Sequence, residues 1–163
     1  MVAQGVEVVV RLLVAFGLSY ILGFERELRG SMAGDRTFSL IGVGAAVIGI
    51  VAAHGAPNAL AGVVTGIGFI GGGLVFRQTT KQGEVLRGIT TAAAIFAAAA
   101  IGAAAGAGFL LAAALGTAMV LLILEIRHIP VLRVLDARRW SSRFANDEAA
   151  DPAAATDPGS TRP

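Results

Sequence analysis

Two long stretches of this chain lack charged side chains. No Asp, Glu, Lys or Arg occurs between Arg36 and Arg77 or between Arg87 and Glu125, which leaves uncharged runs of 40 and 37 residues. The hydrocarbon core of a bilayer is about 30 Å thick, and roughly 20 helical residues cross it. Each run therefore has the length of two membrane-spanning helices joined by a tight turn.

Residues that favour turns interrupt both runs near their middle. Pro57 and Asn58 divide the first run, and three glycines within residues 102–108 divide the second. Only 15% of the chain is charged, against roughly a quarter of an ordinary soluble domain. With one further span near the N-terminus, the sequence predicts an all-α, polytopic transmembrane bundle with spans near 6–24, 37–54, 59–76, 88–105 and 108–125.

The first of these apolar stretches contains two charges. It can cross the membrane because Glu7 and Arg11 lie near its outer end, where they can reach the interface and pair across one helical turn. A cleaved signal peptide is a poorer interpretation, since an acid precedes the first Arg and the run ends at Glu25 and Arg26, not at a small-residue cleavage site. A four-span alternative, with this segment lying in the interface, keeps every later loop on the same side.

Basic residues gather in alternate connections between the predicted spans. Of the 13 Lys and Arg residues, all except Arg11 fall between the first and second spans, between the third and fourth, or after the fifth. The positive-inside rule places these segments in the cytoplasm, so the N-terminus lies outside and the C-terminus lies in the cytoplasm. The predicted location is the inner (plasma) membrane, crossed several times.

By composition the chain divides into three parts. Residues 1–128 form the predicted transmembrane domain, and 129–144 form a basic juxtamembrane segment that either lies on the inner leaflet or serves only as a stop-transfer anchor. Residues 145–163 are rich in Ala, Asp and Pro, and we expect them to be disordered. The absence of cysteine excludes disulfides and thiolate metal sites.

The third predicted span is rich in glycine. Residues 66–71 match the G-x-G-x-x-G pattern of dinucleotide-binding turns, but that mechanism needs a preceding strand and a later acid, which an uncharged membrane segment does not supply. The glycines also give two G-x-x-x-G spacings, at which small residues let helices approach closely. We therefore predict that this span is the centre of the bundle, packed through Gly62, Gly66, Gly68 and Gly72.

The most unusual polar residues lie at the cytoplasmic ends of the predicted spans. Thr37, Thr90 and Thr91 stand where a hydroxyl could cap a helix N-terminus, and the positive end of the helix dipole could favour an anion or a carboxylate partner there. Capping and interface anchoring alone are the simpler interpretation. The candidate partner or effector residues are Glu25, Arg26, Arg36, Thr37, Arg77, Arg87, Thr90 and Thr91.

Three motifs, in order along the chain, resemble the MgtC/SapB family of bacterial inner-membrane proteins. Residues 25–37 are similar to the family's E-R-E/Q run followed by A-G-x-R-T, residues 65–73 to its S-G-I-G-F-L-G-A-G segment, and residues 87–93 to its R-G-L-T-T-A-A run. Asp35 and Phe96 depart from the family pattern, which usually has Leu at the first position and commonly Trp at the second. The chain resembles a short form of the family that lacks a soluble C-terminal domain.

This resemblance implies a role in magnesium homeostasis or adaptation to low magnesium and, in pathogens, in survival inside host cells. Family members are regarded as magnesium transporters or as regulators of membrane partners such as the proton-translocating ATP synthase. A Mg²⁺ path would need oxygen ligands, whereas Thr65 and Thr117 are the clearest polar residues at mid-depth of any predicted span. We therefore expect a non-catalytic regulatory or adaptor protein, with a magnesium or other cation transporter or channel as the alternative.

The sequence contains no nucleophile–base pair, metal-ligand cluster or phosphate-binding loop. We therefore expect no enzyme activity, no catalytic residue, no bound metal and no cofactor. The expected partners are the lipid bilayer, a membrane protein such as ATP synthase, and a second copy of the chain in a homo-oligomer. Nucleic acid is not expected as a partner.

Overall fold

The computed structural model describes residues 2–80, 83–126 and 128. Contacts within the chain divide it into two units, residues 1–121 and 122–163, and each is described by itself. The predicted basic segment at 129–144 and the predicted disordered tail at 145–163 lie outside the described residues.

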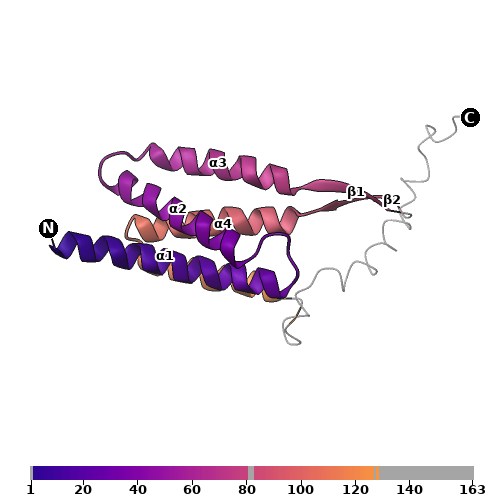
Figure 1. Ribbon diagram of the computed structural model, residues 1–163, viewed down its shortest axis with the longest axis horizontal. Coiled ribbons are helices and arrows are strands. Elements are labelled where there is room, and N and C mark those ends of the chain that lie inside the picture. The colour runs from indigo at the N-terminus through magenta and orange to yellow at the C-terminus, as the bar shows by residue number, and fades with distance from the viewer. Residues whose placement is uncertain (1, 81–82, 127, 129–163) are drawn as a thin grey trace, which may run out of the picture. The chain divides into compact units, whose positions relative to one another are not determined.

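Five helices and one β-hairpin make up the described chain (Figure 1). In chain order they are α1 (Val2–Leu28), α2 (Asp35–Ala53), α3 (Ala59–Leu74), β1 (Phe76–Thr80), β2 (Gly83–Arg87), α4 (Ile89–Gly106) and α5 (Leu110–Glu125). The helices follow the apolar runs and end where glycine, proline or charged residues interrupt them. The predicted all-α bundle of five helices is therefore confirmed.

Three of the helices are long and apolar enough to cross a membrane, judged by length and composition. They are Gln4–Leu28, Asp35–Ala53 and Ile89–Gly106. The helices α3 and α5 are apolar but have only 16 residues each. At about 1.5 Å per residue such a helix is roughly 24 Å long, somewhat less than the hydrocarbon core. That all five helices cross the membrane stays a prediction.

The β-hairpin was not predicted from the sequence. Its strands are antiparallel, with Phe76 opposite Arg87 and Thr80 opposite Gly83. It connects α3 to α4 and extends past the ends of these helices (Figure 1). Two strands of five residues are too short for a hydrophobic period to distinguish them from a polar loop. The hairpin also ends α3 at Leu74, two residues before the predicted end of the third span.

The core of the bundle lies among α1, α2 and α4, which run side by side in Figure 1. Its largest fully buried apolar side chains come one from each helix: Leu22, Phe38 and Ile95. The remaining core positions are mostly alanine. Small side chains bring the helix backbones close together, which is how helices associate where lipid offers no hydrophobic driving force.

The closest backbone approach joins α2 to α4. A Cβ atom added to Gly102 would overlap the backbone of Gly42, and one added to Gly106 would overlap the backbone of Ala46. Both pairs advance along the two helices together, so α2 and α4 run parallel at this contact. The spacing Gly102-x-x-x-Gly106 is the one that lets right-handed helix pairs form in membranes.

The prediction that the third helix forms the centre of the bundle is wrong for the packing within this chain. A Cβ added to Gly62, Gly66, Gly68 or Gly72 would meet no atom within 4 Å. The helix α3 instead contacts α4 near Gly71, where an added Cβ would lie 3.6 Å from the Cβ of Ala92. The centre is formed instead by Gly42 and Ala46 of α2 with Gly102 and Gly106 of α4, because the backbones of these two pairs face each other.

Arg11 joins the N-terminal half of α1 to the C-terminal end of α4. Its Nη1 donates a hydrogen bond to the carbonyl oxygen of Gly106 at 2.8 Å, and Nη2 pairs with the carboxylate of Glu7. The predicted Glu7–Arg11 pair is therefore confirmed. The last turn of a helix leaves its carbonyl groups without partners, and the guanidinium of Arg11 donates a hydrogen bond to one of them. Arg11 therefore connects α1 to the C-terminus of α4.

Candidate functional site at the helix ends

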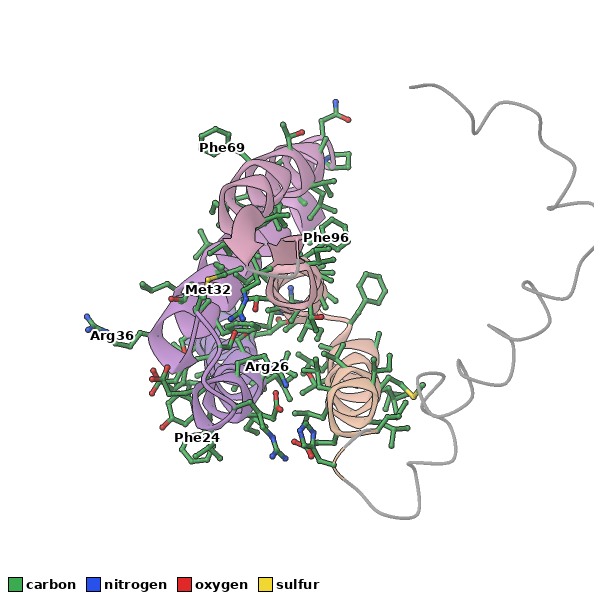
Figure 2. The ribbon with its side chains drawn as sticks, turned by 90° about the vertical axis from the view of Figure 1, so that its right-hand side faces the viewer. Phe24, Arg26, Met32, Arg36, Phe69 and Phe96 are labelled. Carbon is green, nitrogen blue, oxygen red and sulfur yellow. The ribbon has the colours of Figure 1, made fainter. Side chains whose placement is uncertain are left out.

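The last turn of α1 contains a buried ion pair. Glu25 and Arg26 are 9% and 8% exposed, and the Nε and Nη2 atoms of Arg26 donate to the two carboxylate oxygens of Glu25. Arg29 adds a second cation, with its Nε 3.7 Å from a Glu25 oxygen. Figure 2 shows Arg26 on the side of α1 that faces the other helices. Buried charges carry a large desolvation cost, so a pair placed here is a candidate for a functional role.

The turn after α1 fixes the backbone around this pair. The N–H of Ser31 donates to the carbonyl of Arg26 at 3.0 Å, and the N–H of Gly30 donates to that of Glu27 at 3.0 Å. This is the Schellman pattern, and it requires the left-handed conformation that Gly30 adopts at φ +67°. The helix end that carries Glu25 and Arg26 is thus rigidly closed by its own backbone.

A hydroxyl pair ties this turn to α4. The side chains of Ser31 and Thr91 lie 3.0 Å apart, oxygen to oxygen, and Thr91 is 8% exposed. We refer to Glu25, Arg26, Ser31 and Thr91 as the mouth cluster. Sequence reasoning named three of these residues and missed Ser31, because a partner 60 residues away has no local signal.

The predicted capping role of the threonines is wrong. The N-cap residues are Gly34 for α2 and Gly88 for α4, and neither helix has a side-chain cap hydrogen bond. Gly88 is needed there, since its φ is +89° and an added Cβ would overlap the carbonyl of Leu74. The close approach of α3 to the start of α4 therefore leaves no room for a capping side chain at that position.

The remaining candidates lie apart from the mouth cluster. Arg36, Arg87 and Thr90 are exposed, and Thr37 is half-buried at the start of α2. In Figure 2 Arg36 points away from the bundle, on the side opposite to Arg26. Arg77 belongs to β1, and its side chain is outside the described part of the structure. The structure thus pairs Glu25 with Arg26, joins Thr91 to the turn after α1 through Ser31, and leaves the other candidates separate.

The hydroxyls predicted at mid-depth are satisfied within their own helices. Thr65 donates to the carbonyl of Ala61 at 3.0 Å, and Thr117 donates to that of Ala113 at 2.9 Å. A hydroxyl that bonds to the carbonyl four residues earlier needs no further partner. Neither side chain therefore requires a ligand or an ion to satisfy it. Thr117 is buried at 3% exposure, whereas Thr65 lies on the exposed side of α3.

Comparisons with known proteins identify what the chain is similar to. The family model described as MgtC family matches residues 12–130. Protein MgtC of Brucella abortus (strain 2308) is 37% identical over 127 residues, which are 75% of this chain and 51% of the relative. The protein named "Putative magnesium transporter YhiD" of Escherichia coli (strain K12) is 36% identical over 143 residues, 80% of this chain and 65% of the relative. No solved structure matches the chain.

The matched segment includes the mouth cluster, the hairpin and all of α2, α3, α4 and α5. The chain spans about half the length of the Brucella relative. Together with three helices that are long and apolar enough to cross a bilayer, the match identifies a membrane protein.

Proposed function

The chain belongs to the MgtC family, and we propose that it is a non-catalytic regulatory or adaptor protein that serves magnesium homeostasis or adaptation to low magnesium. It acts by binding a membrane protein, for which the proton-translocating ATP synthase is the candidate we favour. The names of the relatives MgtC and YhiD support the link to magnesium. No catalytic step is assigned to any residue in this proposal.

The observation that carries this proposal is the occupation of the Glu25 carboxylate. Both of its oxygens are engaged by Arg26, and Arg29 lies nearby as a second cation. Magnesium ions need free oxygen ligands and lose their hydration shell reluctantly. A carboxylate whose two oxygens are both engaged by a guanidinium offers no free ligand to a cation. This engagement supports a docking role over a cation path.

The mouth cluster also offers a way for a partner to influence the bundle. The Ser31–Thr91 bond joins the α1–α2 turn to the first turn of α4, which follows directly on the hairpin. A partner that binds the exposed Arg87 and Thr90 would therefore contact the element that holds this bond. We propose that partner binding is sensed through the connection between α4 and the end of α1.

The open glycines of α3 support a partner within the membrane. Small residues on a helix surface allow another helix to approach closely in lipid. A Cβ added to Gly68 or Gly72 would meet no atom within 4 Å, whereas Gly62 and Gly66 line a pocket between α3 and α2. We propose that a transmembrane helix of the partner, or of a second copy of the chain, packs on the side of α3 that carries Gly68 and Gly72.

The test separates function from folding. Arg87→Ala and Thr90→Ala remove exposed groups, so each should leave protein abundance within about 20% of the wild type, because exposed groups contribute at most about 1 kcal/mol. Growth under magnesium limitation should nevertheless fail. Asn58→Ala, an exposed change in the α2–α3 connection, is the control and should grow normally. Normal growth of both the Arg87→Ala and the Thr90→Ala variants would contradict the proposal, as would growth that falls only in proportion to abundance.

The alternative function is a magnesium or other cation transporter or channel, which the name of the Escherichia coli relative favours. Purified protein in proteoliposomes distinguishes the two. The regulatory proposal predicts no Mg²⁺ flux above that of protein-free vesicles when a magnesium gradient is imposed. A flux that depends on the gradient and on the amount of protein would favour transport.

We further propose that the chain crosses the bacterial inner membrane five times, with its N-terminus outside. Reporters fused after Arg29 and Lys81 should then report cytoplasm, and a reporter near Pro57 should report the exterior. The asymmetric distribution of basic residues supports this orientation. A reporter after Lys81 that lies outside would overturn it.

A further inference from the structure

A groove lies between α1 and α2, on the surface of the bundle. Its volume is about 310 Å³, and it is lined by Phe16, Tyr20, Asp35, Arg36, Ser39 and Leu40. The apolar residues lie along the two helices, whereas both charged residues belong to the first turn of α2. The groove therefore has a long apolar wall and a charged end where α2 begins.

The wall on α1 is aromatic. Ring centroids of Phe16 and Tyr20 lie 5.8 Å apart, and those of Tyr20 and Phe24 lie 6.1 Å apart. All three side chains are 40–48% exposed, so they face outward from the bundle. Figure 2 shows Phe24 pointing outward at the end of this row. In a membrane protein, exposed aromatic residues near a helix end contact lipid tails and the headgroup boundary.

The charged end carries one anion and one cation that are not paired with each other. One carboxylate oxygen of Asp35 accepts a hydrogen bond from the backbone N–H of Arg36 at 2.6 Å, which leaves the second oxygen for another donor. The guanidinium of Arg36 forms no ion pair with any described residue and points away from the bundle (Figure 2). The site can therefore bind a positive and a negative group at once.

We propose that this groove binds one phospholipid with a zwitterionic primary-amine headgroup, such as phosphatidylethanolamine. Its ammonium group donates to Asp35, its phosphate binds Arg36, and one acyl chain lies along Phe16, Tyr20 and Leu40. A lipid with only a negative headgroup would satisfy Arg36 but would be repelled by the neighbouring carboxylate. Charge complementarity thus selects the zwitterion, and charge-assisted hydrogen bonds supply the strong contacts.

This inference goes beyond the proposed function, because it requires a membrane protein but no partner and no role for magnesium. It is tested by binding alone. The full-length protein is purified in detergent and titrated, in native mass spectrometry, with phosphatidylethanolamine, phosphatidylglycerol and phosphatidylcholine of identical acyl chains. Phosphatidylethanolamine should bind roughly tenfold more tightly than either of the others, as expected for one charge-assisted hydrogen bond.

Two outcomes with the wild-type protein would overturn the proposal. Tighter binding of phosphatidylglycerol would show a simple anion site at Arg36. Equal binding of phosphatidylcholine would show that no hydrogen bond is donated to Asp35, because a quaternary ammonium has no N–H.

Variants locate the site. Asp35→Asn should abolish the preference for phosphatidylethanolamine over phosphatidylcholine. Arg36→Gln should weaken the binding of all three lipids alike, whereas Arg36→Lys should retain most of the binding. Glu7→Gln removes the same charge as Asp35→Asn from an exposed position near the start of α1, away from the groove, and it should change nothing. Circular dichroism checks that each variant is folded. Equal effects of Asp35→Asn and Glu7→Gln, or no effect of either, would overturn the assignment.

Discussion

The helices α3 and α4 carry the same glycine spacing in opposite environments. On α4, Gly102 and Gly106 press against the backbone of α2, so closely that neither position has room for a Cβ atom. On α3, Gly62 and Gly66 have the same separation, and an added Cβ would meet no atom within 4 Å. A G-x-x-x-G spacing therefore indicates a surface suited to close helix packing, but it does not specify which helix uses that surface.

The largest expected effect comes from filling the closed interface. Gly102→Leu forces a side chain into the backbone of Gly42, and overpacking of this kind costs about 3 kcal/mol or more. We expect little folded protein. Gly68→Leu, the matched change on α3, should not destabilise the fold and should raise its stability by up to about 1 kcal/mol, since the position is open and Gly is a poor helix former.

Thermal unfolding in detergent, followed by the helical circular dichroism signal, measures both Gly→Leu variants. Equal losses of stability would mean that α3 is packed against something in the isolated protein, and the comparison between the two helices would fail. In cells, Gly68→Leu should also retain its abundance. A growth defect at normal abundance would then locate the proposed partner surface on α3.

A second prediction concerns Arg11, which binds α4 at Gly106, the last glycine of its contact with α2. Arg11→Ala removes the hydrogen bond to the Gly106 carbonyl, and hydrogen bonds to charged groups contribute about 2 kcal/mol. Glu7→Gln removes only the exposed partner of the ion pair and should cost about 0.5 kcal/mol. Chemical denaturation of both variants measures the difference. If Arg11→Ala cost no more than Glu7→Gln, Arg11 would be only a surface charge.

The two interfaces also show what sequence patterns can predict. The two uncharged runs predicted four of the five helices, because bilayer thickness fixes how many apolar residues a span needs. The adjacent charges Glu25 and Arg26 were identified as candidates because charged residues directly after an apolar run are easy to recognise in a sequence. Contacts between distant segments, such as Ser31 with Thr91 or Arg11 with Gly106, depend on how the helices pack.

Glycine marks the limit of such prediction most clearly. The third helix was selected as the centre because it has two G-x-x-x-G spacings, yet the centre is formed by α2 and α4, whose small residues face each other. In a membrane the environment outside the bundle is as apolar as its interior, so composition does not distinguish a buried face from an exposed one. A soluble protein would have placed charged residues on the exposed side.

A third prediction is that the same change, Gly to Ala, alters stability in opposite directions at two positions. Gly66→Ala adds a Cβ in open space and replaces a poor helix former, so it should stabilise the fold by up to about 1 kcal/mol. Gly106→Ala adds the same atom against the backbone of Ala46 and should destabilise it. Unfolding temperatures in one detergent compare the two directly. The same sign at both positions would contradict the distinction between an open and a closed surface.

The smallest expected effect lies at the contact between α1 and α2, where Ser19 of α1 faces Gly42. The Ser19 hydroxyl is fully buried and makes no hydrogen bond with any described residue. Leaving such a group without a partner is unfavourable, so Ser19→Ala should remove a penalty and lose only the small contact with Gly42. We expect the variant to be more stable by a few tenths of a kcal/mol, on the scale of buried polar groups.

The matched control is Ser39→Ala on α2. Its hydroxyl donates to the Asp35 carbonyl at 2.7 Å, so its loss should destabilise the protein by about 0.5 kcal/mol. The difference in sign between the two serine variants is the measurement, made by unfolding in the same detergent. If Ser19→Ala were destabilising by more than Ser39→Ala, the Ser19 hydroxyl would have a hydrogen-bond partner. The contact between α1 and α2 would then depend on a polar bond as well as on the glycine at position 42.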